Sequence, residues 1–94
     1  MPEVEYRNLD EQIDKYLEEY NIFALMDTIS YILSHFKIYM HVKRNDVILL
    51  YKDQTLNGFI LTAVLRTGVA VKIKIDMDKS KEKVIGVDVW YVNE

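Results

Sequence analysis

The sequence predicts an α+β domain of two layers, in which an N-terminal αα hairpin packs on a four-stranded antiparallel meander sheet. Up to Asn45 the apolar residues recur every three or four positions, the spacing of helices with one buried face. From Asp46 onward they form short, β-branched runs separated by turn residues, which is typical of strands. With 94 residues there is room for a single domain. We expect one domain over 1–94, with a tail at 1–7, a helical half at 8–42 and a sheet half at 47–92.

The first helix is expected to begin after Asn8. Asn8 and Glu11 have the spacing of a capping box, in which the Asn side chain accepts a hydrogen bond from the third amide of the helix. One apolar stripe follows at helical spacing, formed by Leu9, Ile13, Tyr16, Leu17 and Tyr20. Most acidic residues of the segment lie off this stripe, so one face of the helix should be buried.

A second helix is expected after Asn21. Its apolar stripe is longer and is formed by Ile22, Leu25, Met26, Ile29, Ile32, Leu33, Phe36 and Met40. At about 100° per residue, the two stripes would lie on opposite sides of one continuous helix. Asn21 tolerates a left-handed backbone, so a break there would let both stripes face one core as a hairpin.

Four runs are predicted as strands: 47–52, 59–66, 69–76 and 84–92. Thr67-Gly68 fits a two-residue hairpin turn, which sets Arg66 opposite Val69. For the last strand we prefer the register with Asp88 opposite Lys72, because it pairs opposite charges on the outer face. These registers give the helix-covered face Val47, Leu49, Tyr51, Ile60, Thr62, Val64, Val71, Ile73, Ile75, Ile85, Val87, Val89 and Tyr91.

The same registers leave an apolar face away from the helices, carrying Ile48, Leu50, Phe59, Leu61, Leu65 and Trp90. Monomeric soluble proteins rarely expose contiguous apolar patches above a few hundred Å². We therefore expect this face to be covered, and a self-complementary homodimer is the commonest solution for a small soluble chain. Two alternatives stay open: one helix of the chain wraps onto this face, or a partner protein or apolar ligand covers it.

Charge is distributed unevenly along the chain. Residues 1–34 carry two basic and eight acidic side chains, whereas residues 35–83 carry ten basic and five acidic ones. The acidic helix could simply pack beside the basic strands. Alternatively, the basic surface could bind nucleic acid, with Tyr39, Tyr51 or Trp90 available for stacking. The candidate contacts are then Lys43, Arg44, Arg66, Lys72 and Lys74. The net charge of −3 and the lack of a nucleic-acid-binding signature make this the second choice.

The acidic run after the third strand resembles the start of a calcium-binding loop. Asp76, Asp78, Ser80 and Glu82 alternate as its first ligands do, but Lys81 stands where Gly is required. The twelfth position is also not a Glu. A solvated hairpin loop is the better interpretation.

Other chemistry finds no support in the sequence. His35 and His41 are six residues apart, not at the four-residue spacing of a helical metal site, and we expect His41 at the C-terminal end of a helix. The chain has no cysteine and its three glycines are too widely spaced for a phosphate-binding loop. We expect no enzyme activity, cofactor or metal.

These observations together predict a small, non-enzymatic interaction protein that works as a homodimer, as an accessory, regulatory or inhibitory factor. The start of the chain lacks a signal-peptide pattern and the segment 22–40 is too polar to span a membrane, so we expect a cytoplasmic protein. The abundance of Ile, Val, Tyr, Lys and Glu favours a thermophilic source, including an archaeon or its virus.

Overall fold

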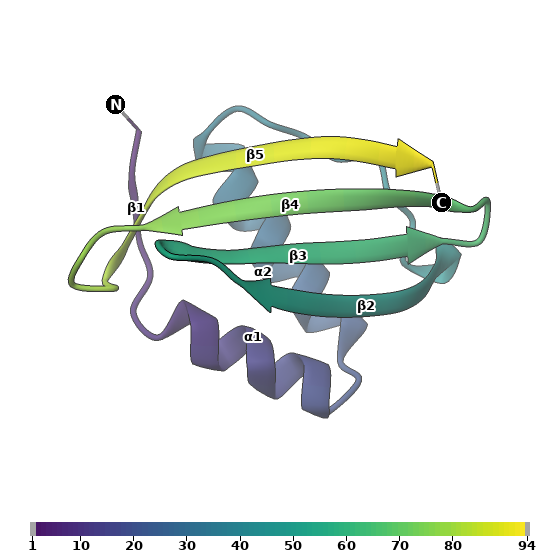
Figure 1. The fold of residues 1–94 in the computed structure, drawn as a ribbon, viewed down its shortest axis with the longest axis horizontal. Coiled ribbons are helices and arrows are strands. Elements are labelled where there is room, and N and C mark those ends of the chain that lie inside the picture. The colour runs from purple at the N-terminus through teal and green to yellow at the C-terminus, as the bar shows by residue number, and fades with distance from the viewer. Residues whose placement is uncertain (1, 94) are drawn as a thin grey trace.

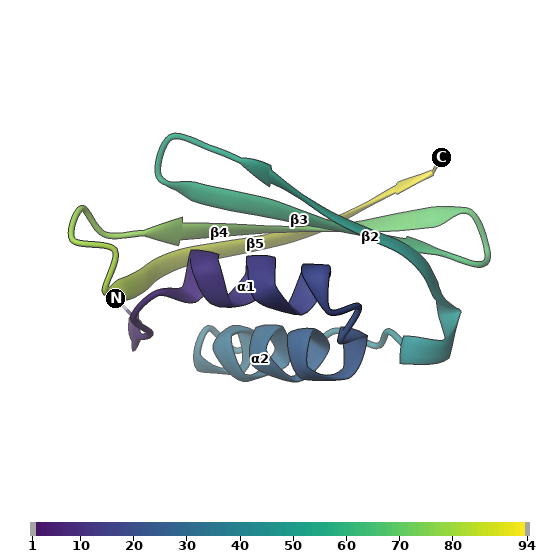
Figure 2. The same ribbon diagram turned by 90° about the horizontal axis from the view of Figure 1, so that it is seen from below.

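Two helices lie on one face of a five-stranded antiparallel sheet in this computed structural model, which describes residues 2–93 (Figures 1 and 2). The predicted α+β class is confirmed, as is the order of a helical half followed by a sheet half. Neither helix in the described range is long and apolar enough to cross a membrane. The elements are β1 (Val4–Glu5), α1 (Leu9–Glu18), α2 (Ile22–His35), the 3₁₀ turn η1 (Arg44–Asp46), β2 (Val47–Gln54), β3 (Gly58–Leu65), β4 (Val69–Met77) and β5 (Lys83–Asn93).

The sheet has the strand order β1-β5-β4-β3-β2. The four predicted strands form the expected meander, and β1 is an additional strand inside the segment predicted as a tail. In β1, Val4 pairs with Val84 and Glu5 with Lys83. Val4 is buried in the core, so the chain start is fixed at the edge of the sheet. Two residues are too few to show an alternating pattern in the sequence.

The helix starts differ from the prediction in detail. Asn8 has a left-handed backbone (φ 58°) and makes no side-chain cap, so the predicted capping box is wrong. A capping side chain needs an extended backbone to reach the third amide, and Asn8 instead turns the chain from β1 into α1. The predicted break between the helices is confirmed, but Tyr20 takes the left-handed conformation (φ 53°). Asn21 is the N-cap of α2, and its side chain accepts from the amide of Ala24 at 3.1 Å.

The second helix is shorter than the predicted helical half, which extended to residue 42. It ends at His35, and Lys37 follows with a left-handed backbone (φ 59°). The chain then runs in an extended conformation, and Ile38, Met40 and Val42 still pack against the core. Apolar positions at 36 and 40 fit helical spacing, but 36, 38, 40 and 42 also fit a period of two. His41 therefore lies in an extended segment and not at a helix end.

The register of the β3–β4 hairpin differs from the prediction by one residue. Val64 pairs with Ala70 and Leu61 with Ile73, which leaves a three-residue loop of Arg66, Thr67 and Gly68. Gly68 adopts φ 93°, and its amide donates to the carbonyl of Leu65 at 2.9 Å. This is the common three-residue hairpin with glycine in the position that needs positive φ. A slip of one residue exchanges the two faces of a strand. Ile60, Thr62 and Val64, predicted beneath the helices, therefore lie on the opposite face, and so do Leu49 and Tyr51 of β2.

The predicted apolar outer face is therefore wrong for most of its members. Phe59 and Leu61 are fully buried beneath the helices, and Leu50 and Leu65 are partly buried against the same core. Because β3 is apolar on both sides, its alternation alone does not identify the buried side. Of the predicted interface, Ile48 is exposed, and Trp90 lies on the face away from the helices.

The pairing of β5 differs by two residues, which preserves the faces. Lys72 pairs with Trp90, and Lys74 pairs with Asp88. Opposite charges therefore do pair on the outer face, but Asp88 lies opposite Lys74 and not Lys72. A bulge at the end of β4 sets Val84 opposite Met77. Val84 is buried as a result, and Ile85, which was predicted on the core face, is 42% exposed.

Candidate functional site

The face of the sheet opposite the helices is the main candidate surface, and we call it the open face. No helix of the described chain covers it (Figure 2). The strand registers arrange its side chains in rows that cross the sheet from β2 to β5. The apolar row is Leu49, Val64, Ala70 and Val92; the central row is Tyr51, Thr62, Lys72 and Trp90; the charged row is Asp53, Ile60, Lys74 and Asp88.

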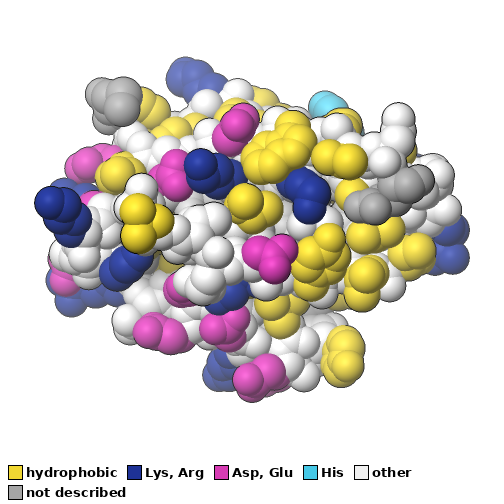
Figure 3. Space-filling view, in the orientation of Figure 1, with side chains coloured by type: hydrophobic (Ala, Val, Ile, Leu, Met, Phe, Trp, Pro, Cys, Tyr) yellow, Lys and Arg dark blue, Asp and Glu magenta, His cyan; other side chains and the backbone are white. Residues whose placement is uncertain are grey.

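The apolar row lies toward the β3–β4 hairpin. Figure 3 views the open face, and hydrophobic side chains gather at this end, where β3 finishes and β2 begins. Leu49 is 55% exposed, and Val64 and Val92 are half-buried. Only Ala70 is fully buried. This end of the face therefore presents apolar surface to solvent without cover from the chain itself.

The central row places one ammonium group near an aromatic ring. Lys72 Nζ donates to the hydroxyl of Thr62 at 3.1 Å and lies 5.8 Å from the centroid of the Tyr51 ring. Trp90 is its cross-strand neighbour on the other side. Thr62 is fully buried although it lies on the open face, since the longer side chains around it exclude solvent. The hydrogen bond holds the lysine head over the sheet.

The opposite end of the open face has mixed charge. Lys74 is paired across the strands with Asp88, and Asp53 lies two strands away in the same row. Asp76 follows in the next row. Two lysines thus share the face with three carboxylates, so the open face is not a basic surface.

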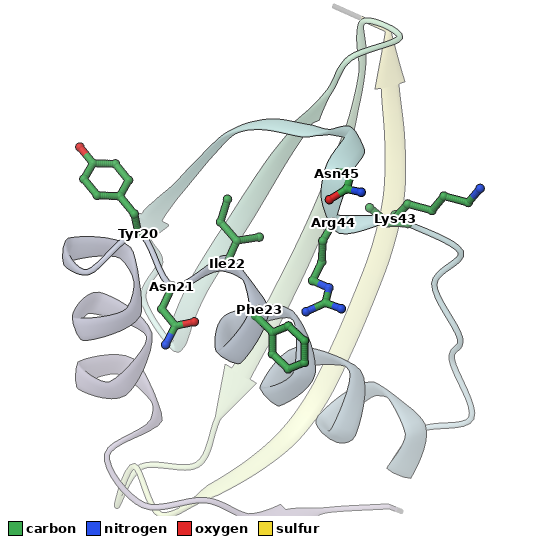
Figure 4. A pocket seen from close by; sticks show the side chains of 8 residues that line it. Tyr20, Asn21, Ile22, Phe23, Lys43, Arg44 and Asn45 are labelled. Atoms are coloured by element: carbon green, nitrogen blue, oxygen red, sulfur yellow. The ribbon is translucent and has the colours of Figure 1, made fainter.

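The five basic residues predicted for nucleic acid are not brought together. Lys72 and Lys74 lie on the open face, whereas Lys43 and Arg44 lie beside the start of α2 (Figure 4). Arg66 lies in the β3–β4 loop, and its Nη2 donates to the carbonyl of Asn45 at 2.9 Å. The predicted group therefore divides between separate parts of the surface.

An open pocket lies between the start of α2 and η1, with a volume of about 790 Å³. Its wall is formed mainly by residues 20–23 and 42–45. The guanidinium carbon of Arg44 lies 3.5 Å from the centroid of the Phe23 ring, and Figure 4 shows the two side chains meeting there. The side chain of Lys43 points away from this stack in Figure 4, so the cationic groups do not converge.

The acidic loop before β5 stabilises its own turn. The carboxylate of Asp78 accepts hydrogen bonds from the Ser80 hydroxyl and from the backbone amides of Glu82 and Lys83, and these bonds lower the pKa of Asp78. Across residues 2–93, no three His, Asp or Glu side chains are grouped so that they could hold a metal ion. His35 lies on the surface of α2, with Nδ1 2.9 Å from the carbonyl oxygen of Tyr31.

An ion cluster with one buried member, Lys52, joins β2 to α1. The Lys52 side chain is only 8% exposed, and its ammonium donates to the carboxylates of Asp10 and Asp14, the latter at 2.6 Å. Burial acts to lower the pKa of Lys52, but the hydrogen bonds and charges of the two aspartates outweigh it and raise the pKa above the ordinary value. Gln54 also donates to Asp10, at 2.7 Å. This cluster fixes α1 against the helix-covered face of the sheet.

No protein-family model matches the sequence, and no curated protein or solved structure matches it significantly. The geometry of the open face is therefore the basis for a functional proposal.

Proposed function

We propose that this chain is a non-enzymatic interaction protein that forms a homodimer through the open face of its sheet. The observation that carries the proposal is the placement of both helices on one face. It leaves the open face without a covering helix, with Leu49 exposed and Val64, Val92, Tyr51 and Trp90 half-buried. Such a protein would act as an accessory, regulatory or inhibitory factor by occupying the surface of a partner.

A second copy suits this surface because sheets pack well face to face. Two twisted sheets stack about 10 Å apart with their strands within about 30° of each other. A two-fold axis near the apolar row would set Leu49 and Val64 of one copy against the same residues of the other. Removing this apolar area from water contributes about 25 cal/mol per Å². The charged row would then lie at the rim, where Lys74 and Asp88 stay hydrated.

The test is the molar mass of Leu49→Glu, measured by sedimentation velocity over a range of concentrations. Leu49 is 55% exposed, so the charge should leave the fold intact while it opposes contact between the faces. The matched control is Leu56→Glu, because Leu56 is 93% exposed in the turn between β2 and β3, away from the apolar row. We expect Leu49→Glu to halve the mass and Leu56→Glu to leave it unchanged. A wild-type mass for Leu49→Glu, with unchanged circular dichroism, would refute the proposal.

Single-stranded nucleic acid is the second candidate for the open face, and one observation favours it. The central row offers two aromatic side chains, Tyr51 and Trp90, on either side of residue Lys72 in the row. Aromatic side chains that stack on bases beside a basic group are how many single-strand binders work. The three carboxylates of the face oppose this function.

A mobility shift at low salt distinguishes this candidate. If nucleic acid binds here, Lys72→Glu combined with Lys74→Glu should weaken binding and reduce its salt dependence. If the wild-type protein shifts neither a single-stranded nor a duplex probe, nucleic-acid binding by the open face is excluded.

The composition supports two further parts of the proposal. Ile, Val, Tyr, Lys and Glu are abundant, as in many proteins of hot-living organisms, and we infer a thermophilic archaeon or its virus as the source. The absence of cysteine is compatible with a role in the cytoplasm.

A further inference from the structure

The outer edge of β5 is open along most of its length. β1 pairs only with Lys83 and Val84, whereas β5 continues to Asn93. Figure 1 shows β5 as the last long strand of the sheet, with β1 crossing only at its start. Within the described chain, no strand pairs with this edge beyond Val84. Unpaired amide and carbonyl groups on an edge strand are a template for another strand.

Beyond its bulge at Ile85, this edge lacks the other features with which proteins usually block strand addition. From Gly86 to Asn93 the only charged side chain is Asp88, and there is no proline or lysine. The opposite edge of the sheet also has a bulge, between Val47 and Leu49 of β2. It also carries charged residues in its second half. Bulges and charges of this kind hinder edge-to-edge pairing, so the two edges of the sheet are not equivalent.

A groove lies beside the open edge. It has a volume of about 460 Å³ and lies between β5 and the extended segment after α2. Tyr39 is 70% exposed and Tyr91 is 59% exposed, so both aromatic side chains are largely uncovered. A strand added to β5 would place alternate side chains over this groove. Its lining residues are Ile38, Tyr39, Met40, Val89, Trp90 and Tyr91.

We propose that β5 is a second self-association surface, through which two copies of the chain pair their β5 strands antiparallel in one continuous sheet. β5 is the right occupant for its own edge, because its helix-side residues Val87, Val89 and Tyr91 are apolar and would lie over the groove of the other copy. The one charge of the edge, Asp88, already has Lys74 of its own chain as cross-strand neighbour.

This contact does not depend on the open-face homodimer. A two-fold axis perpendicular to the sheet relates the two β5 strands, and the open faces of both copies then point to the same side. If the open faces also pair, the two contacts close an assembly of four chains with two stacked sheets. If they do not, the chain is a dimer through β5 alone.

The first test is the molar mass of Tyr91→Lys, alone and combined with Leu49→Glu. A lysine on an edge strand opposes pairing, and the exposure of Tyr91 allows the change without loss of the core. Tyr20→Lys is the matched control, since Tyr20 is 89% exposed between the two helices. We expect Tyr91→Lys to halve the mass, Tyr20→Lys to leave it unchanged, and the double variant to be a single chain. An unchanged mass for Tyr91→Lys would overturn the β5 contact, whereas an unchanged mass for Leu49→Glu concerns only the open face.

A second measurement does not depend on the stability of that variant. Because the chain has no cysteine, single cysteines at each position from 87 to 91 report contacts between copies without background. In a two-fold antiparallel pair one position lies opposite itself, so one variant should form a disulfide-linked dimer much faster than its neighbours. Leu56→Cys is the control for random collision. If all five variants crosslink no faster than Leu56→Cys, β5 does not pair with itself, and its edge is left for another protein.

Discussion

In the ion cluster between β2 and α1, removing the lysine should cost less stability than removing its two aspartate partners. Lys52 is 8% exposed, but its partners Asp10 and Asp14 are 40% and 54% exposed in their side chains. Lys52→Met leaves two carboxylates that can turn to solvent, so the loss should resemble that of a surface ion pair, about 1 kcal/mol. The double variant Asp10→Asn with Asp14→Asn instead leaves a buried ammonium without a counter-charge, which should cost about 3 kcal/mol.

Urea unfolding and thermal unfolding, both followed by far-ultraviolet circular dichroism, measure both losses. For a domain of this size, 1 kcal/mol corresponds to about 4–8 °C in the melting temperature, so the two variants should be clearly separated. The raised pKa of Lys52 adds a pH test. The lysine contributes fully below its unfolded pKa of about 10.5, and this contribution is lost as the pH rises through the higher folded pKa. Wild type should therefore lose its advantage over Lys52→Met at strongly alkaline pH. A larger loss for Lys52→Met than for the double variant would refute the burial asymmetry.

Three further predictions concern other parts of the molecule. Trp90 is the single tryptophan and lies on the open face, so its emission should shift to shorter wavelength as the protein concentration rises; emission independent of concentration would count against the homodimer. The lowered pKa of Asp78 means that its hydrogen bonds stabilise the loop above about pH 3.8 and are lost as the pH falls through the lower folded pKa. The protection factor of the Lys83 amide against hydrogen exchange should fall there, and Asp78→Asn should remove this fall in protection. Gly58→Ala would place its Cβ 2.0 Å from the backbone oxygen of Ile75, so we expect a loss of about 3 kcal/mol in urea unfolding, and a neutral result would contradict the close approach of β3 and β4.

In the helical half, the local sequence pattern predicts where α2 begins, whereas tertiary packing determines where it ends. The break before α2 is predictable because two apolar stripes on opposite sides of a helix cannot face one core together. The end of α2 is not predictable in the same way, since Phe36 and Met40 fit both a helix and an extended chain. Packing of the segment after His35 against the core decides between them.

For the open face, too, the sequence predicts some features and the tertiary structure decides the others. The sequence predicts a sheet that is apolar on both faces, but it leaves open whether one helix wraps onto the second face; the structure places both helices on the same side. Which residues lie there depended on the length of one loop. A two-residue and a three-residue turn are both compatible with Arg66-Thr67-Gly68, and they place opposite sets of β3 side chains in the core. Only Trp90 and Ile48 of the predicted interface are outside the core.

The sequence alone determined the class of fold, four of the five strands and the absence of recognisable catalytic motifs, since hydrophobic periodicity and residue chemistry are local properties of the chain. The tertiary structure decided which side of the sheet is open, how Tyr51, Lys72 and Trp90 come to form one row, and that β5 has a free edge. These features depend on pairing between strands that are distant in sequence. When a strand is apolar on both faces, the alternation of its side chains does not show which face is buried.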